Sequence, residues 1–107
     1  MRDKNEETNE QLIFVFSKNI LSKLETKHGQ ITQEDVKECF DNNDDRVLED
    51  TREKNKTLPP TQWFISENNN GRRIKVCFIY RENVNKIYIK TAYEPNNEEI
   101  RIFNKYA

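Results

Sequence analysis

Apolar residues in the first half of the chain recur every three or four positions, the period of an amphipathic helix. Ser17 can cap the first such segment, and Gly29 is placed to end it. Thr32 can cap the second, with Asp35 at its third helical position. The pattern predicts two short helices joined at Gly29 and Gln30 as an αα-hairpin. Their apolar faces comprise Ile20, Leu21 and Leu24 in the first helix and Val36, Cys39 and Phe40 in the second.

The period changes to alternation after the turn DNNDD, as expected of β-strands. Three strands are predicted, TQWFIS (61–66), RRIKVCFIY (72–80) and KIYIKTAY (86–93), joined by short turns into an antiparallel meander. RVLEDTRE (46–53) is compatible with a further short strand. The run LIFVF (12–16) is either a strand or the lead-in to the first helix, because periodicity does not separate the two.

Alternation also divides the strand residues between two faces of the sheet. The predicted core face carries Ile74, Val76, Phe78 and Tyr80 from one strand and Ile87, Ile89, Thr91 and Tyr93 from the next, and the opposite face carries Arg73, Lys75, Cys77, Tyr88, Lys90 and Ala92. Lys75 and Lys90 are then expected near each other. Such a basic strip suits a phosphate backbone, although lysines on an open sheet face also simply keep it soluble.

The end of the chain predicts a closing helix. Pro95 stops the last strand, and Asn96 or Asn97 can cap a helix whose inward residues are expected to be Ile100, Phe103 and Tyr106. The elements together predict an α+β domain with an N-terminal αα-hairpin, an antiparallel three- to four-stranded meander sheet and a closing C-terminal helix. Residues 1–10 are expected to form a flexible tail and residues 11–107 a single domain.

Composition adds constraints on function. The 18 Lys and Arg nearly balance the 19 Asp and Glu, so any binding to nucleic acid must rest on a local patch. Cys39 and Cys77 fall in apolar segments and are expected to be reduced, buried thiols, with a disulfide between them as the less favoured alternative. Metal-binding motifs such as CxxC or HExxH do not occur in the sequence, so neither a metal site nor another cofactor is expected. The N-terminus is unlike a signal peptide and LIFVF is too short to span a bilayer, which predicts a cytoplasmic protein without membrane contact.

Several residues could carry chemistry. The cluster Glu49, Asp50, Arg52 and Glu53 is either an ion-pair network or an acid and an arginine held at a sheet edge facing the lysines. Trp63 alternates with Phe64, so an exposed ring of this pair could stack on a base, although core packing is the default for both. His28 precedes Gly29 at a helix end, where the helix dipole favours a cation and a structural role.

Four motifs carry a resemblance to a known family: KHG followed by an acidic helix and Phe40, a charged link containing Glu53, the strand pair RRIKVCFIY and KIYIKTAYEP, and the final helix EEIRIFNKY. In these motifs the chain resembles the small BrnT-like toxins of bacterial toxin–antitoxin modules, relatives of the RelE-type ribonucleases. The similarity spans residues 27 to 106. Three features depart from the family: the near-neutral charge, the strand containing QWF after the double proline, and Tyr93, which stands where the family has an arginine.

The resemblance implies a compact α+β fold, metal-independent cleavage of RNA by attack of the ribose 2′-hydroxyl, and inhibition by a cognate antitoxin protein. A homodimer is also compatible with it. On this hypothesis the catalytic residues are Lys90, Tyr93, Glu94, Arg73, Glu53 and His28, and the RNA-binding residues are Lys75, Arg72, Lys27, Arg52 and Trp63. The cations would stabilise the phosphorane, Glu53 or Glu94 would act as the base, and Tyr93 or His28 as the acid.

A second hypothesis is a non-enzymatic protein-binding module, such as a phage or mobile-element protein that pairs with its partner through Trp63 and the acidic loops. The near-neutral net charge favours this second hypothesis. The clustering of polar residues at the strand ends and the family resemblance favour the first.

Overall fold

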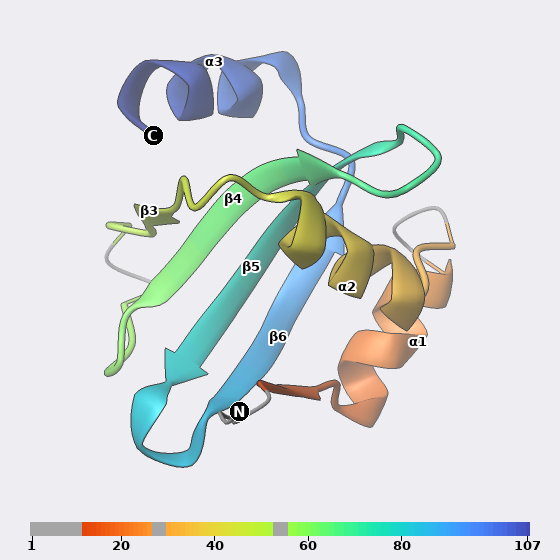
Figure 1. Ribbon diagram of the computed structural model, residues 1–107, viewed down its shortest axis with the longest axis vertical. Helices are drawn as coiled ribbons and strands as arrows, with labels where there is room; N and C mark the ends of the chain where they lie inside the picture. The colour runs from red at the N-terminus through yellow and green to blue at the C-terminus, as the bar shows by residue number, and fades with distance from the viewer. Residues whose placement is uncertain (1–11, 27–29, 53–55) are drawn as a thin grey trace, which may run out of the picture.

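The computed structural model describes residues 12–26, 30–52 and 56–107 as a five-stranded sheet flanked by helices (Figure 1). The sheet has the strand order β2-β6-β5-β4-β3. In chain order the elements are β2 (Ile13–Val15), α1 (Lys18–Thr26), α2 (Gln33–Asn42), β3 (Leu48–Glu49), β4 (Thr61–Glu67), β5 (Arg73–Arg81), the 3-10 helix η3 (Glu82–Val84), β6 (Lys86–Tyr93) and α3 (Asn97–Tyr106).

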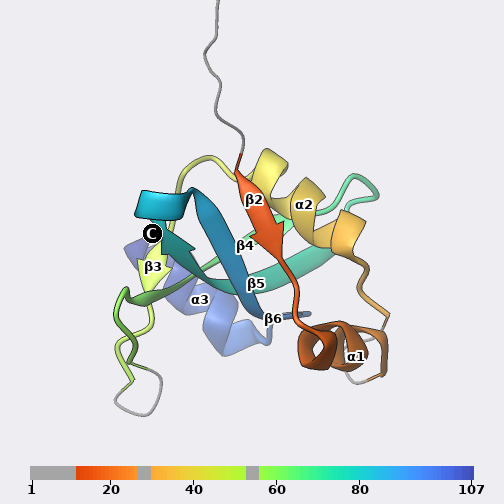
Figure 2. The same ribbon diagram turned by 90° about the horizontal axis from the view of Figure 1, so that it is seen from below.

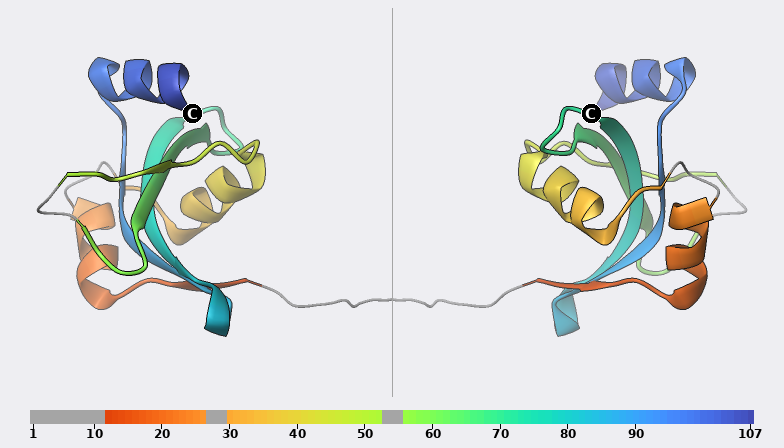
Figure 3. Two further views of the ribbon diagram at one scale, coloured as in Figure 1. Left: turned by 90° about the vertical axis from the view of Figure 1, so that its left-hand side faces the viewer. Right: turned by 90° about the vertical axis from the view of Figure 1, so that its right-hand side faces the viewer.

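The predicted helical hairpin over an antiparallel meander is wrong, although the domain is of the α+β type. The run LIFVF forms β2, which precedes both helices and pairs in parallel with β6 at the sheet edge, so the sheet is mixed. Its first hydrogen bond runs from the Ile13 amide to the Asn85 carbonyl at 3.0 Å. Figures 2 and 3 show α2 on one side of the sheet and α1 beside β6 toward the other side. Local periodicity could not predict this arrangement, because β2 and β6 lie at opposite ends of the chain.

The predicted helix starts are confirmed. Ser17 accepts a hydrogen bond from an amide in the first turn of α1 at 3.2 Å. Thr32 and Asp35 form a reciprocal capping box at the start of α2, with both bonds at 3.0 Å. Asn96 and Glu99 do the same for α3, at 2.9 and 2.8 Å. Each cap satisfies amides that have no partner within the helix, which typically stabilises a helix by about 1 kcal/mol.

Both faces of the sheet are buried at its centre. On the α2 side, Phe40 meets three sheet rings edge-on, with centroids 4.8 to 5.1 Å apart. Those rings are Phe14, Phe64 and Phe78. On the other side, Trp63 packs against Phe103 of α3 at 5.8 Å. Trp63 and Phe64 therefore belong to the core, on opposite faces.

Helix α3 crosses one end of the sheet, where it rests mainly on β4 (Figure 1). Phe103 is buried as predicted, and Ile100 is partly buried. Tyr106 is 64% exposed, so the prediction that it faces inward is wrong. A helix that lies across one end of a sheet buries only a narrow strip of its surface, and Tyr106 lies outside that strip.

The predicted turn between β4 and β5 is tied to α2 by hydrogen bonds with Asn42 and Glu38 and by the buried side chain of Asn68. Its Oδ1 accepts hydrogen bonds from the amides of Asn70 (3.0 Å) and Arg72 (2.9 Å), and its Nδ2 donates to Asp35 Oδ1 (3.1 Å). Gly71 has a φ of 82°, a backbone conformation that only glycine adopts without strain. The turn is therefore built from side-chain hydrogen bonds as well as from glycine.

A β-bulge in β6 interrupts the alternation on which the face prediction depends. Cys77 pairs with Thr91, whereas the next residue, Phe78, pairs with Ile89. Lys90 is thus an extra residue with no partner on β5. Bulges bend a strand and redirect the side chains that follow, and they occur often beside functional sites.

The face assignment beyond the bulge is therefore wrong. Ala92 is fully buried opposite Val76, on the α2 side, where the prediction placed Thr91 and Tyr93. Tyr93 instead lies opposite Lys75, on the other face. The extra residue thus brings the tyrosine and the lysine together.

Candidate functional site

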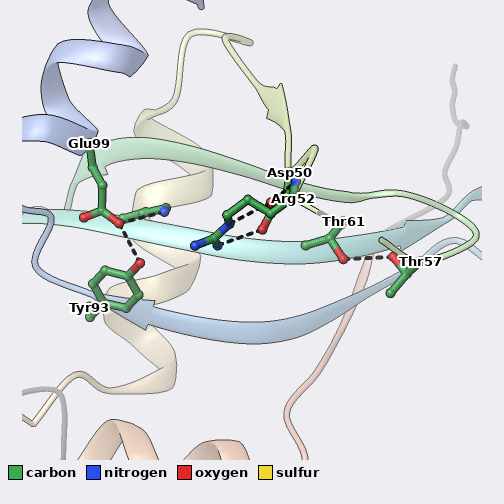
Figure 4. A network of polar contacts seen from close by, with 7 residues as sticks. Asp50, Arg52, Thr57, Thr61, Tyr93 and Glu99 are labelled. Atoms are coloured by element: carbon green, nitrogen blue, oxygen red, sulfur yellow. Dashed lines mark hydrogen bonds and ion pairs between the residues drawn. The ribbon is translucent and has the colours of Figure 1, made fainter. Parts of the chain in front are cut away.

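The sheet face away from α2 contains a hollow of about 250 Å³ where the segment after β3 meets β5 and β6 (Figure 4). We call it the central hollow. It is lined by Asp50, Arg52, Thr57, Thr61, Cys77, Lys90, Thr91 and Tyr93. Strand alternation in β4 and β5 and the bulge in β6 direct the strand residues of this set to the same face.

Asp50 and Arg52 form a bidentate ion pair at one wall of the central hollow. The guanidinium donates to the two carboxylate oxygens at 3.1 and 3.0 Å, and the Arg52 amide donates to Asp50 Oδ1 at 3.1 Å. The hydrogen bond from Arg52 lowers the pKa of Asp50, which therefore stays ionised. The Asp50 side chain is 9% exposed and that of Arg52 is 60% exposed, so the arginine is the partner that a ligand can reach.

Lys75 is buried at 5% exposure between α3 and the sheet. Its Nζ lies 2.9 Å from Glu99 Oε2 and 4.4 Å from the centre of the Trp63 ring. Burial pulls the pKa of Lys75 down, but the hydrogen bond to Glu99, with help from nearby groups, raises it above its ordinary value. The lysine expected on an open basic strip is instead half of a buried ion pair.

Glu99 connects α3 to the sheet through both of its oxygens. Oε1 accepts from the Asn96 amide at 2.9 Å and completes the capping box. Oε2 accepts from Lys75 at 2.9 Å and from the Tyr93 hydroxyl at 2.8 Å. Burial raises the pKa of Glu99, but the hydrogen bonds from Lys75, Asn96 and Tyr93 outweigh burial and lower it. Glu99 is therefore ionised, and both of its carboxylate oxygens accept hydrogen bonds within the protein.

Tyr93 presents its phenol ring to the central hollow while its hydroxyl donates to Glu99 (Figure 4). Burial, and then the hydrogen bond to Glu99, raise the pKa of Tyr93, whereas Lys75 acts in the opposite direction. The phenol thus keeps its proton at neutral pH and is a hydrogen-bond donor in this position.

Lys90 projects from the bulge at the rim of the central hollow, where it is exposed. It makes no ion pair with any residue in the described ranges. Cys77 lines the same hollow but is only 7% exposed, and burial raises the pKa of its thiol to about 11. Because the thiolate is the nucleophilic form, Cys77 is not activated for nucleophilic attack at neutral pH.

Other predicted site residues lie away from the central hollow. Arg72 and Glu94 form an ion pair with each other at 3.0 Å. Arg73 lines a separate hollow between α2 and α3. Trp63 is 8% exposed beneath α3, which leaves little of its ring for stacking on a base.

Lys27, His28 and Glu53 lie outside the described residues, so their predicted roles stay predictions. Of the predicted set, the structure brings Arg52, Lys90 and Tyr93 together around one hollow, with Lys75 behind the tyrosine.

Two important residues were not predicted as members of the site. Asp50 was named only as part of a charged cluster, and Glu99 was not named as a site residue. The spacing Asn96-x-x-Glu99 is a capping-box signal, but the second oxygen of Glu99 finds its partners only in the folded chain.

The chain matches neither a protein-family model nor a curated protein sequence. Within residues 12–26, 30–52 and 56–107, groups of three or more His, Cys, Asp or Glu side chains that could hold a metal ion do not occur. In the same ranges, the helices are too short or too polar to cross a membrane.

Proposed function

We propose that the protein is a toxin-like endoribonuclease that binds an RNA phosphate in the central hollow and cleaves the chain by attack of the 2′-hydroxyl. The observation that carries this proposal is the convergence of Arg52, Lys90 and the Tyr93 phenol on one hollow. The one carboxylate in its described lining, Asp50, is paired with Arg52, whose side chain is 60% exposed and can still donate its remaining N–H groups to a phosphate. Two cations and a proton donor are groups that a phosphorane requires.

In the proposed reaction the 2′-oxygen bonds to phosphorus and the bond from phosphorus to the 5′-oxygen breaks. Arg52 and Lys90 stabilise the added negative charge. The Tyr93 hydroxyl turns from Glu99 to the RNA and gives its proton to the leaving 5′-oxygen. Lys75, whose Nζ lies 5.5 Å from the centre of the Tyr93 ring, stabilises the phenolate that remains. Glu53, which directly follows Arg52 in the chain, stays the predicted base that takes the 2′-proton.

The family resemblance supports the same proposal and adds a cognate antitoxin and a bacterial cytoplasmic location to it. The competing protein-binding hypothesis relied on Trp63 and the acidic loops. The burial of that ring beneath α3 weakens the second hypothesis.

Cleavage of end-labelled RNA by the purified protein, with a chelator present, tests the proposal. We expect products that end in a 2′,3′-cyclic phosphate and a 5′-hydroxyl, and no cleavage of RNA that lacks 2′-hydroxyls. Lys90→Ala and Tyr93→Phe should each slow cleavage about 100-fold. Lys37→Ala, on α2 away from the hollow, is the matched control and should cleave like the wild type.

Induced expression in bacteria tests the same proposal without a chosen substrate. The wild type should arrest growth and degrade cellular RNA, and the Lys90 and Tyr93 variants should do neither. Normal growth with intact RNA in cells that contain folded wild-type protein would contradict the proposed function.

A further inference from the structure

A second hollow, of about 750 Å³, lies on the sheet beside the central hollow. The end of β2, one side of α1 and the neighbouring strands β5 and β6 form its walls. We call it the basic groove, and define it by Val15, Lys23, Ile79, Arg81, Tyr88 and Lys90. Lys90 lines both hollows, so the bulge residue stands where they meet.

The floor of the basic groove continues into the central hollow. Val15 pairs with Tyr88, Tyr88 with Ile79, and Ile79 with Thr61, so these four residues form one row across four strands. Thr61, at the end of the row, lines the central hollow. Paired residues on one sheet face are close neighbours, and the row therefore forms a continuous path between the two hollows.

The charges in the basic groove have one sign. Lys23, Arg81 and Lys90 are its charged lining residues, and all three are exposed cations. None of them makes an ion pair with a residue that the structure describes. Some cations elsewhere on the surface are bound to carboxylates about 3 Å away or closer, namely Arg46, Arg72 and Arg101. Among the described residues, the groove cations thus have no carboxylate partner, although the chain carries a net charge of −1.

An aromatic ring accompanies these cations. Tyr88 is partly exposed on the groove floor between Val15 and Ile79. Grooves that combine cations for the backbone with an aromatic face for the bases are typical of single-stranded nucleic-acid binding. An acidic peptide would satisfy the cations, but it would use neither the ring nor the continuity with the central hollow.

We infer that the basic groove binds the stretch of single-stranded RNA that flanks the scissile phosphate. Lys23 and Arg81 contact backbone phosphates, Tyr88 stacks on a base, and Lys90 lies between this stretch and the reacting phosphate. The inference rests on the proposed function, since the same RNA strand occupies both hollows.

Binding of a non-cleavable, fluorescent 2′-O-methyl oligonucleotide of about 12 nucleotides tests the groove without requiring catalysis. The double variant Lys23→Glu with Arg81→Glu should bind at least about 10-fold more weakly than the wild type. Its slope of log affinity against log salt should be shallower by about 1.4, because two single-strand phosphate contacts at about 0.7 each are lost. Tyr88→Ala should weaken binding without changing the slope.

The matched control is Lys37→Glu with Lys105→Glu, which reverses two charges on α2 and α3 outside the groove. It should retain the affinity and salt slope of the wild type. Equal loss in both double variants would mean that only net charge matters, and it would overturn the inference. If the variant Lys23→Glu with Arg81→Glu loses binding to an acidic peptide but binds RNA like the wild type, the groove is a site for a protein partner. That result would also overturn the inference.

Cleavage kinetics separate the inference from the proposed function. A dinucleotide can occupy only the central hollow, so the groove variant should cleave it like the wild type and lose kcat/KM only on long RNA. If the groove variant cleaves long RNA normally, the groove inference fails and the proposed function stands. If wild type cleaves neither substrate but binds the oligonucleotide through the groove cations, the proposed function fails and the groove remains an RNA site.

Discussion

At the scale of single residues, Glu99 is the side chain that connects helix α3 to the sheet, because each of its two oxygens accepts hydrogen bonds from a different part of the fold. One oxygen completes the capping box of α3, and the other accepts hydrogen bonds from Lys75 and Tyr93. The buried ammonium of Lys75 depends on this carboxylate, since removing one partner of a buried pair leaves the other charge uncompensated.

Glu99→Gln separates these two roles, because glutamine can still complete a capping box. We expect the variant to unfold at lower urea concentration, with a loss of about 3 kcal/mol at neutral pH, because Lys75 loses its counter-charge. The control is Glu98→Gln in the same turn, whose exposed pair with Arg101 should contribute little. Equal stability of the two variants would contradict this role of Glu99.

The pH dependence of this difference has a definite sign. The folded pKa of Glu99 lies below its ordinary value of 4.5, so the pair contributes fully above pH 4.5 and is lost as the pH falls through the folded pKa. The stability difference between wild type and Glu99→Gln should therefore narrow below pH 4.5. Other carboxyl groups titrate equally in both proteins and cancel from the difference.

At the scale of elements, the bulge in β6 and the turn after β4 decide which side chains reach the site. Without the bulge, regular alternation of Ile89, Thr91 and Tyr93 would place Tyr93 on the face toward α2. The turn at Asn68 joins β4 to β5 and also bonds to Asp35 of α2, so it fixes the sheet relative to that helix.

Asn68→Ala tests how much the turn depends on its side-chain hydrogen bonds. We expect a loss of about 2 kcal/mol in the free energy of unfolding, because two turn amides and Asp35 lose a partner. Asn70→Ala, in the same turn but exposed, is the control and should unfold like the wild type. Chemical denaturation of both variants measures the difference, and equal losses would show that the hydrogen bonds of the Asn68 side chain do not stabilise the turn.

At the scale of the whole molecule, packing on both sheet faces buries the two cysteines on opposite sides. Both are free and buried, as predicted, with Cys39 in α2 and Cys77 in β5 beneath the central hollow. Burial raises the pKa of Cys39 to about 12 and that of Cys77 to about 11. Both thiols should therefore be unreactive while the protein is folded.

A chromogenic disulfide reagent at neutral pH measures this reactivity. The two thiols of the folded protein should react slowly with the reagent. In the denatured protein both thiols should react rapidly. Cys77→Ser identifies which cysteine accounts for any residual reaction. Rapid reaction of Cys77 in the folded protein would show that the central hollow leaves its sulfur open to solvent and to proton loss.

The candidate site was only partly predictable from the sequence. Lys90 and Tyr93 were predicted as site residues because they are polar side chains near the end of a predicted strand, where packing of the core does not require them. Lys75 was predicted to lie on an open face, but α3 folds over it and supplies Glu99. The position of a helix relative to a sheet depends on contacts between distant segments, which a local pattern does not contain.

The sequence by itself determined the elements whose signals are local: the caps at Ser17, Thr32 and Asn96, the extents of the three long strands, and the two buried thiols. These depend on neighbouring residues and on hydrophobic period. Only the tertiary structure decided the parallel pairing of β2 with β6, the separation of α1 from α2, and the bulge that sends Tyr93 to the face of Lys75. Each of these depends on hydrogen bonds or packing between segments far apart in the chain, where many pairings satisfy the same alternation and only the assembled core selects one.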